Sequence, residues 1–452
     1  MGRLFGTNGV RGVVNQDLTV DVVTRLAASA GAFLGRDIAV GRDGRTSSPM
    51  FRDAVTSGLL SVGCVVHDAG MLPTPALQLS VKNLGLDGGV MVTASHNPPE
   101  FNGVKVIAGD GVEISREDEA KIEESYFSGG PGLSQWDQIG KVERLEALGP
   151  YKEAVMAHVD CGAIREAGLR IAIDPGNGVA ALVAPDLARD LGCEVFTINV
   201  NVDGGFPGRN SEPRPDNLGA LSALVQASGA DLGIAFDGDG DRSVFVDGEG
   251  EVHWGDRSFA LVAREFISRN PGAEVATPVS SSKVIEDIVT AGGGRVVWTK
   301  VGSVVVSRTM VDEGIELGGE ENGGVMYGPH LQVRDGSMAM ALILDIMAKT
   351  GKPLSELFGE LPQYHQMKDR VDCPEELKVR ALEELSRSVK APVVEHVDGP
   401  KLRYPDGSWI LVRPSGTEPV FRLYAEAGSP ERVAELVEDQ KALVESILKS
   451  IS

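Results

Sequence analysis

Three aspartates at alternate positions, Asp237, Asp239 and Asp241, stand in the segment FDGDGDR directly after an apolar run. Side chains two residues apart point to one side of an extended segment, so we expect the three carboxylates to converge. Three negative charges this close repel one another unless a cation lies between them, and Mg²⁺ prefers such oxygen ligands. The spacing of this aspartate loop (residues 237–242) therefore predicts a divalent-metal site, with a solvated acidic turn as the alternative. Arg242 beside a metal would suit a phosphate.

A serine that could act as a nucleophile, Ser95, lies in the segment VMVTASHNPPEFNGVK. It follows a strand-like apolar run, in a serine loop (residues 93–100) that we expect to be exposed. A serine hydrolase needs a base held by a third group, often with a GxSxG elbow, and neither is visible here. His96, as the immediate neighbour, is a poor position for a base acting on Ser95 Oγ. A serine together with a metal loop points to phosphoryl transfer, where positioning and charge neutralisation do most of the catalysis.

Two further loops carry groups suited to a sugar phosphate. The RPSGTEP loop (residues 413–419) combines a guanidinium, two hydroxyls and a glycine, with Arg422 close behind. Such groups bind a phosphate dianion. The glutamate loop (residues 318–324, GGEENGG) offers two glutamates and an asparagine between glycines, and these acceptors suit sugar hydroxyls. Taken alone, each loop is explained equally well as an ordinary turn.

One pattern of elements occurs three times along the chain and would position these loops. A short apolar strand ends in a turn, a helix-length segment and a second strand follow, and a third strand then leads into a polar loop. The first strands begin at Ile38, Leu169 and Glu274. Strands alternating with helix-length segments predict α/β domains whose sheets are largely parallel. Ligands bind beyond the carboxyl ends of such strands, so the three loops are expected to face one cleft.

The domain boundaries follow from this repeat. We predict domain I at residues 1–150 with the serine loop, domain II at 151–250 with the aspartate loop, and domain III at 251–367 with the glutamate loop. After residue 367 the pattern changes to strands, the RPSGTEP loop and an amphipathic C-terminal helix beginning at Ser429. This predicts a smaller α+β domain IV at 368–452. The expected fold class is α/β, with three related α/β domains and a C-terminal α+β domain around a central active-site cleft.

The composition narrows the class of protein. Of the 452 residues, 42% are apolar and 24% charged, as is usual for soluble globular chains. The net charge of −22 argues against a nucleic-acid partner. The four cysteines form no CxxC pair, which disfavours a disulfide framework or a zinc site and fits a reducing compartment. With no signal-peptide pattern and no apolar run of about 18 residues, we expect a cytoplasmic protein that does not enter a membrane.

The segments TASHNPPEFNGVK, FDGDGDR, GGEENGG and RPSGTEP, in this order, resemble the motifs of the α-D-phosphohexomutase superfamily of phosphoglucosamine mutases, phosphomannomutases and phosphoglucomutases. FGTNGVRG and VGRDGRTSS resemble it too, so the likeness covers essentially the whole chain, and FGTNGVRG leans towards the phosphoglucosamine mutase branch. The resemblance implies an intramolecular phosphotransferase, an isomerase that interconverts hexose 6-phosphates and 1-phosphates through a phosphoserine and a sugar 1,6-bisphosphate. It implies Mg²⁺ as cofactor, the bisphosphate as activator and hexose phosphates as partners. A homodimer is left open.

The resemblance also implies roles for individual residues. Ser95 would carry the phosphoryl group, and Arg11 and Lys105 are the candidates for proton transfer to and from the sugar oxygen. The catalytic set is Ser95, Arg11, His96, Lys105 and Arg242. The metal set is Ser95, Asp237, Asp239 and Asp241. The substrate-binding set is Glu320, Asn322, Ser303, Arg413, Ser415, Gly416, Thr417 and Arg422.

Three positions depart from the family's pattern. Asn322 stands where bacterial members usually have serine, Gly324 where many have histidine, and Ser303 where many have aspartate or histidine. All three concern sugar contacts, so glucosamine phosphate is the first expectation, with mannose or glucose phosphate as the alternative. Rivals of another class are a metal-dependent sugar phosphatase or kinase that uses Ser95 as a relay, and a non-catalytic sugar-phosphate-binding paralogue. The second rival is disfavoured because every catalytic position is filled.

Overall fold

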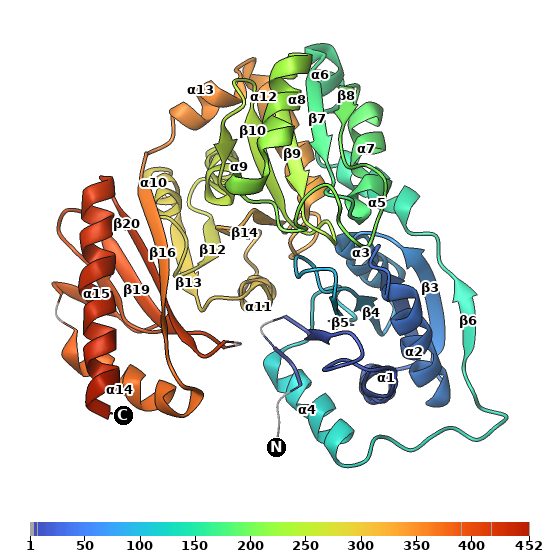
Figure 1. The fold of residues 1–452 in the computed structure, drawn as a ribbon. Helices are drawn as coiled ribbons and strands as arrows, with labels where there is room; N and C mark the ends of the chain where they lie inside the picture. Colours follow the sequence, from blue (N-terminus) through green and yellow to red (C-terminus); the bar gives the residue numbers. More distant parts are fainter. Residues whose placement is uncertain (1–3, 7, 390, 417, 452) are drawn as a thin grey trace.

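The structure is a computed structural model, and it describes residues 4–6, 8–389, 391–416 and 418–451 (Figure 1). Four sheets follow one another along the chain. None of the helices in this described part is long and apolar enough to cross a membrane.

The first sheet has the strand order β1-β5-β4-β2-β3-β6. Its strands are β1 (Val10–Val13), β2 (Asp37–Arg42), β3 (Val65–Met71), β4 (Gly88–Val92), β5 (Phe101–Ala108) and β6 (Lys141–Arg144). Its helices are α1 (Val20–Leu34), α2 (Ser48–Ser61), α3 (Thr74–Leu84) and α4 (Arg116–Phe127). Every residue of β4 is buried, which explains the continuous apolar run before Ser95.

The second sheet has the order β11-β10-β9-β7-β8. Its strands are β7 (Arg170–Asp174), β8 (Glu194–Thr197), β9 (Leu232–Phe236), β10 (Ser243–Asp247) and β11 (Val252–His253). The helices of this segment are α5 (Leu148–Met156), α6 (Cys161–Ala167), α7 (Ala184–Asp190) and α8 (Gly219–Ser228), with short 3₁₀ turns η1 (Val179–Leu182) and η2 (Pro215–Asn217).

The third sheet has the order β13-β12-β14-β15. Its strands are β12 (Glu274–Pro278), β13 (Arg295–Thr299), β14 (Leu317–Glu320) and β15 (Gly324–Tyr327). Its helices are α9 (Gly255–Arg269), α10 (Lys283–Ala291), α11 (Ser303–Glu313), α12 (Gly336–Thr350) and α13 (Leu354–Gly359).

These three sheets confirm the predicted threefold repeat. In each, the first strand of the repeat lies at the centre with parallel partners on both sides, and a fourth strand runs antiparallel to the third. The third strands are β4, β9 and β14, and the serine, aspartate and glutamate loops connect them to β5, β10 and β15. Equivalent places in three sheets therefore carry the three loops.

The fourth sheet is antiparallel throughout, with the order β16-β20-β19-β18-β17. Its strands are β16 (His365–Asp372), β17 (Val393–Glu395), β18 (Lys401–Arg403), β19 (Trp409–Pro414) and β20 (Val420–Ala427). Its helices are α14 (Lys378–Ser388) and α15 (Pro430–Ile451), with a 3₁₀ turn η3 (Glu375–Leu377). Figure 1 shows α15, in red, lying along this sheet. The predicted fold class, three related α/β domains and a C-terminal α+β domain, is confirmed.

The hydrophobic core is shared unequally among the four units. One continuous cluster runs through the first three and includes Leu77 of α3, Phe236 of β9 and Leu344 of α12. Helix α12 contacts α5, α6 and α9, so it joins the second unit to the third. The C-terminal unit has its own core, and a smaller cluster that includes Trp298 and Trp409 connects it to the third. Residues that meet between the first three units are therefore positioned by one core.

Candidate active site

The serine loop is buried at residues 93–95 and exposed at residues 98–100, and its backbone is strained at Ser95. Ser95 has a φ of 51°, in the left-handed region that residues with a Cβ rarely adopt. The relative exposure of Ser95 is 1%, so the expectation of an exposed turn is wrong for the serine itself, although residues 98–100 of the loop are exposed. The reason is that the aspartate loop of the second unit covers it: a Cβ on Gly238 would lie 2.5 Å from the Ser95 carbonyl oxygen. Ser211 also donates to the His96 carbonyl at 2.8 Å.

Arg45, which the sequence reasoning did not select, holds this loop in its conformation. Its buried guanidinium donates at 2.7–3.0 Å to the carbonyl oxygens of three loop residues, Ser95, Asn97 and Pro98, and of Phe101 at the start of β5. Asp43 pairs with Arg45 Nε at 3.1 Å and accepts from the Thr93 hydroxyl at 2.7 Å. Arg45 belongs to VGRDGRTSS, one of the segments that carry the family resemblance, and that segment could have identified it as a functional residue.

The three aspartates converge, although not by the alternation of an extended segment. Residues 238–241 turn, with Gly240 at a φ of +73°, and this turn directs the carboxylates to one point. One oxygen from each aspartate lies within 4.8 Å of the others. Ser95 Oγ donates to Asp237 Oδ2 at 2.7 Å, which joins the serine loop to the aspartate loop.

Three cations surround the aspartates, and each comes from a different strand or loop. Lys105 Nζ, on β5, lies 2.8 Å from Asp239 Oδ2 and 3.0 Å from Asp241 Oδ2. Arg242 Nε lies 3.3 Å from Asp237 Oδ2. Arg334, between β15 and α12, contacts Asp241 Oδ2 at 2.5 Å, and the sequence reasoning missed it. Buried charges of both signs neutralise one another here, as buried ions must.

The aspartate loop fits a divalent cation because two of its carboxylate oxygens accept no hydrogen bond. Asp239 Oδ1 and Asp241 Oδ1 are buried and accept no hydrogen bond in the described part of the chain. Burial, with Asp241 and Asp239 nearby, raises the pKa of Asp237 to about 7. Converging carboxylate oxygens that accept no hydrogen bond are suited to a hard cation with oxygen ligands. Asp237, Asp239, Asp241 and Ser95 are thus the residues that could hold Mg²⁺.

Arg11 and His96 complete the surroundings of Ser95. Arg11 donates to Asn97 Oδ1 at 2.8 Å, and burial lowers its pKa to about 10. His96 Nδ1 lies 3.3 Å from Ser95 Oγ, so its position next in sequence does not prevent contact. Burial, Arg242 and Arg11 lower the pKa of His96 well below its usual value, so it is a weak base. No carboxylate among the described residues hydrogen-bonds to the His96 ring. Because a serine hydrolase needs such a group to orient its histidine, the structure does not support a hydrolase triad at Ser95.

The glutamate loop lies against the aspartate loop. Ser243 N donates to Gly323 O at 3.1 Å, which connects the two loops through their backbones. Glu320 is buried, burial raises its pKa, and its Oε2 accepts from Arg334 at 3.1 Å. Asn322 Oδ1 is a buried acceptor without a partner in the described part of the chain. Glu320 and Asn322 therefore offer oxygen atoms beside the Ser95–aspartate cluster.

Ser303 lies at the start of α11 and faces the first unit. Its hydroxyl accepts from Asn8 Nδ2 at 3.0 Å, and the Asn8 Oδ1 atom is buried without a partner among the described residues. Asn8 is thus a further polar residue that the sequence reasoning missed. It belongs to FGTNGVRG, which was used only for the resemblance.

The RPSGTEP loop forms a second group of predicted residues, held within the C-terminal unit. Arg413 and Arg422 are cross-strand partners on β19 and β20. Arg413 pairs with Asp398 at 2.6 Å and Arg422 with Glu418 at 2.5 Å. Ser415 is buried, its carbonyl oxygen accepts from Lys378 at 2.8 Å, and Gly416 is exposed. Thr417 lies outside the described residues.

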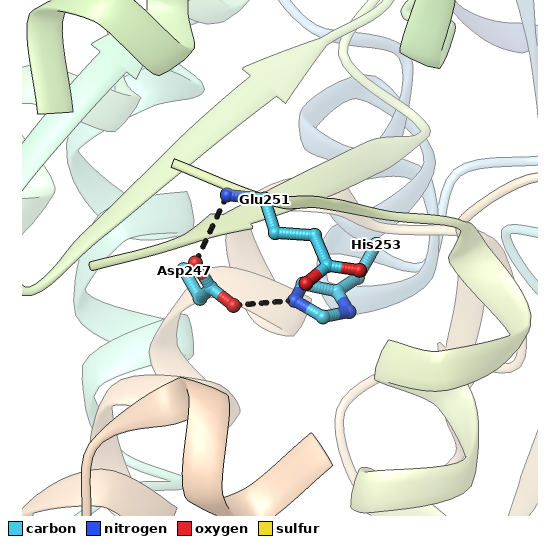
Figure 2. A group of neighbouring side chains, drawn as sticks. All are labelled: Asp247, Glu251 and His253. Atoms are coloured by element: carbon cyan, nitrogen blue, oxygen red, sulfur yellow. Dashed lines mark hydrogen bonds and ion pairs between the residues drawn. The ribbon is translucent and has the colours of Figure 1, made fainter. Parts of the chain in front are cut away.

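A different cluster of metal-ligating side chains lies at the far end of β10. Figure 2 shows Asp247, Glu251 and His253. Asp247 Oδ1 accepts the backbone N–H groups of Glu249 and Glu251, both at 3.0 Å. Its Oδ2 lies 2.7 Å from His253 Nε2. Both oxygens are already used to close the β10–β11 turn, so this cluster leaves no carboxylate oxygen of Asp247 for a ligand.

Comparison with known proteins gives one family along the chain. The phosphoglucomutase/phosphomannomutase α/β/α domains I, II and III match residues 2–131, 149–250 and 254–364, and its C-terminal domain matches 370–442. A phosphoglucomutase/phosphomannomutase of Thermococcus kodakarensis is 41% identical over 99% of this chain and 100% of its own. A phosphoglucosamine/phosphogalactosamine mutase of Sulfurisphaera tokodaii is 44% identical over 98% and 100%. A crystal structure of a Burkholderia thailandensis phosphoglucomutase/phosphomannomutase family protein has a TM-score of 0.88 at 30% identity, covering 98% and 97%.

Proposed function

The chain belongs to the phosphoglucomutase/phosphomannomutase family and is a phosphohexomutase, and from this premise we propose that it works through a phosphoserine at Ser95 and prefers glucosamine phosphate. The observation that carries the proposal is the contact of Ser95 Oγ with Asp237 at 2.7 Å, beside two carboxylates with unpartnered oxygens. This arrangement combines a nucleophile with a site for a divalent cation, as phosphoryl transfer requires.

The proposed reaction runs in two halves at the same serine. Phosphorylated Ser95 gives its phosphoryl group to the free hydroxyl of a hexose monophosphate, so the bond from phosphorus to Oγ breaks and one to the sugar oxygen forms. The hydroxyl loses a proton and Oγ regains one. In the second half the 1,6-bisphosphate gives its other phosphoryl group to Ser95: the bond from that phosphorus to its sugar oxygen breaks, one to Oγ forms, Oγ loses a proton and the sugar oxygen gains one. A bound Mg²⁺ would neutralise charge on the transferring group.

The cations of this chain have separate roles in the proposal. Arg11, whose pKa is lowered to about 10 by burial, is the candidate for proton transfer at the sugar oxygen. Burial lowers the pKa of Lys105, but the neighbouring Asp239 and Asp241 carboxylates raise it, and the net result is a pKa above the usual value. Lys105 therefore stays protonated and serves as a fixed positive charge. Arg242 extends this charge towards the phosphoryl group. Arg413 and Arg422, with the RPSGTEP loop, would hold the phosphate that does not react.

The preference for glucosamine rests on two features. The relative from Sulfurisphaera tokodaii is named for glucosamine and galactosamine, and FGTNGVRG leans towards the same branch. The preference should be shallow, because the bisphosphate turns about in the site and the substituent at carbon 2 then faces a different wall. Glu320 can accept from the 3- and 4-hydroxyls in both orientations, whereas no fixed contact can recognise carbon 2 in both.

The test of the sugar is kcat/KM for the glucosamine, mannose and glucose 1-phosphates under one set of conditions. We expect turnover of at least two, with glucosamine phosphate first, and Asn322→Ser should shift their ratio more than the best rate. A preference above about 10⁵-fold for one sugar, the scale of a site built to bind the distinguishing group, would contradict shallow recognition.

Phosphorus NMR separates a mutase from the phosphatase and kinase alternatives. A 1-phosphate should convert to the 6-phosphate without nucleotide, and glucose 1,6-bisphosphate should shorten the lag as an activator. Inorganic phosphate appearing as fast as the sugar phosphate disappears would instead identify a phosphatase.

A further inference from the structure

Arg334 connects the two acidic loops of the proposed site. Its side chain is 10% exposed, with one terminal nitrogen 2.5 Å from Asp241 Oδ2 and the other 3.1 Å from Glu320 Oε2. Asp241 belongs to the aspartate loop of the second unit, and Glu320 to the glutamate loop of the third. A guanidinium is planar and its nitrogens are fixed relative to one another, so it sets the separation of two carboxylates more closely than an ammonium does.

The contacts of Arg334 also decide which oxygens of these carboxylates remain available. On Asp241, both Arg334 and Lys105 bind Oδ2, whereas Oδ1 is buried, accepts no hydrogen bond among the described residues and lies 3.8 Å from Arg242 Nε. On Glu320, Arg334 binds Oε2. Arg334 and Lys105 therefore occupy one oxygen of the Asp241 carboxylate and leave the other without a hydrogen bond.

Gly324 provides the space in which the Arg334 side chain lies. A Cβ at this position would come within 2.4 Å of Arg334 Cδ and 2.9 Å of Arg334 Cγ. The backbone of Gly324 is not in the left-handed region, so its conformation is open to other residues and does not itself require glycine. The atoms it would meet belong to the stem of Arg334, whose far end is held by both carboxylates. A side chain at 324 can therefore be accommodated only by disturbing these ion pairs or the strand β15.

We propose that Arg334 is a positioning residue of the phosphohexomutase reaction, which holds Asp241 and Glu320 in one relative arrangement, and that residue 324 is glycine to admit it. This inference rests on the proposed function, in which Asp241 serves the metal and Glu320 the sugar. The two residues form a unit: Arg334 can reach both carboxylates only while residue 324 has no side chain.

The experiment is a double-mutant cycle with Arg334→Ala and Gly324→Ala, measured as kcat, KM and the midpoint of thermal unfolding. Arg334→Ala should lower kcat/KM about a hundredfold, the effect of misplacing catalytic groups by about 1 Å, with most of the loss in kcat. Gly324→Ala should lower kcat/KM at least about tenfold with Arg334 present. In the Arg334→Ala background it should change kcat/KM by less than about threefold. The loss of thermal stability caused by Gly324→Ala should shrink in the same way.

Matched controls separate this coupling from general damage. Gly328, just past the other end of β15, is also buried, and a Cβ there would lie 2.8 Å from the backbone of Glu316. Its substitution by alanine should lower the unfolding midpoint equally with and without Arg334. Arg257 donates to the carbonyl oxygens of Phe358 and Pro362 within the third unit, and Arg257→Ala should affect stability but leave kcat within about twofold. Arg334→Lys should recover part of the lost kcat, because an ammonium supplies the charge without the fork.

Two results would overturn the inference. If Arg334→Ala lowers the unfolding midpoint but leaves kcat and KM unchanged, Arg334 is a structural ion pair. If Gly324→Ala costs the same activity with and without Arg334, the glycine is not there to admit it. The Ser95→Ala variant tests the proposed function separately. If Ser95→Ala is inactive, either of these two results rejects the role of Arg334 and leaves the proposed function intact. If Ser95→Ala is active, the phosphoserine mechanism on which the inference rests is wrong.

Discussion

The two ends of strand β10 carry two clusters of metal-ligating side chains, three aspartates at one end and an aspartate, a glutamate and a histidine at the other, and the clusters differ in their hydrogen bonding. At its start, Asp239 and Asp241 each keep a buried oxygen that accepts no hydrogen bond in the described part of the chain. At its end, both oxygens of Asp247 accept hydrogen bonds from residues within its own turn. The first cluster draws its cations from three units of the fold, and the second is complete within residues 247–253.

This difference teaches how a ligand site can be told from a structural cluster. Buried polar groups are normally paired, so several unpaired carboxylate oxygens gathered at one point mark a candidate site for a bound cation. The Asp247 cluster has the composition of a metal site, yet its hydrogen bonds close a hairpin. At the Ser95 end, the strained serine and three cations, one from each of the first three units, contact the Oδ2 atoms of the aspartates and leave two Oδ1 atoms without a hydrogen bond. Strain of this kind persists only where the surrounding structure maintains it.

We call the start of β10, where two aspartate oxygens accept no hydrogen bond, its open end, and the Asp247 end its closed end. The largest effect should come from removing the nucleophile at the open end. Ser95→Ala should abolish mutase turnover, because no other group can carry the phosphoryl between the two ends of the sugar. The fold should persist, since Arg45 binds backbone carbonyls of the loop and not the serine hydroxyl. Interconversion of the 1- and 6-phosphates at a rate near that of the wild type would rule out the covalent route.

A smaller but still large effect is expected from neutralising one aspartate of the open cluster. Asp239→Asn should lower the apparent Mg²⁺ affinity about a hundredfold, because it removes one of three anionic ligands. Titrating the metal against turnover measures this, and an excess of chelator should stop the wild-type enzyme. Full activity in chelator would show that the aspartates serve only the ion pairs with Lys105 and the arginines.

The smallest effect should come from the same substitution at the closed end. Asp247→Asn leaves one oxygen to accept the turn N–H groups but changes the contact with His253. It should therefore cost about 1 kcal/mol of unfolding free energy. Turnover and Mg²⁺ dependence should stay within about twofold of the wild type. Denaturant unfolding together with the kinetic assay checks both, and a loss of Mg²⁺ dependence in this variant would make the two ends equivalent.

The sequence predicted the fold well because the signals were local. Apolar strands alternating with helix-length segments indicated three α/β units, and the loops after β4, β9 and β14 were selected by their residue types. The prediction that Ser95 is exposed was wrong because the residues that cover it, Gly238 and Ser211, belong to another unit. The prediction that the three aspartate carboxylates converge was right, but its reason was wrong. A turn at Gly240, and not the alternation of an extended segment, brings them together.

Residues that act through tertiary contacts escaped the sequence reasoning. Arg334 lies in the unremarkable segment QVRDG, and its contact with Asp241 spans 93 positions along the chain. Only the placement of its stem over Gly324 reveals why that glycine is present. The domain boundaries, a homodimer, a cytoplasmic location and the absence of a nucleic-acid partner stay predictions from sequence.

The central claim, that Ser95 at the open end of β10 carries the phosphoryl group, is tested most directly by intact-protein mass spectrometry. The protein is measured before and after incubation with glucose 1,6-bisphosphate and Mg²⁺, with Ser95→Ala as the matched control. We expect the wild type to reach the mass of the chain plus a single phosphoryl group, with the modification on the peptide that contains Ser95, and Ser95→Ala to remain unmodified. A wild-type chain that never gains this mass, or that gains it equally in Ser95→Ala, would contradict the account.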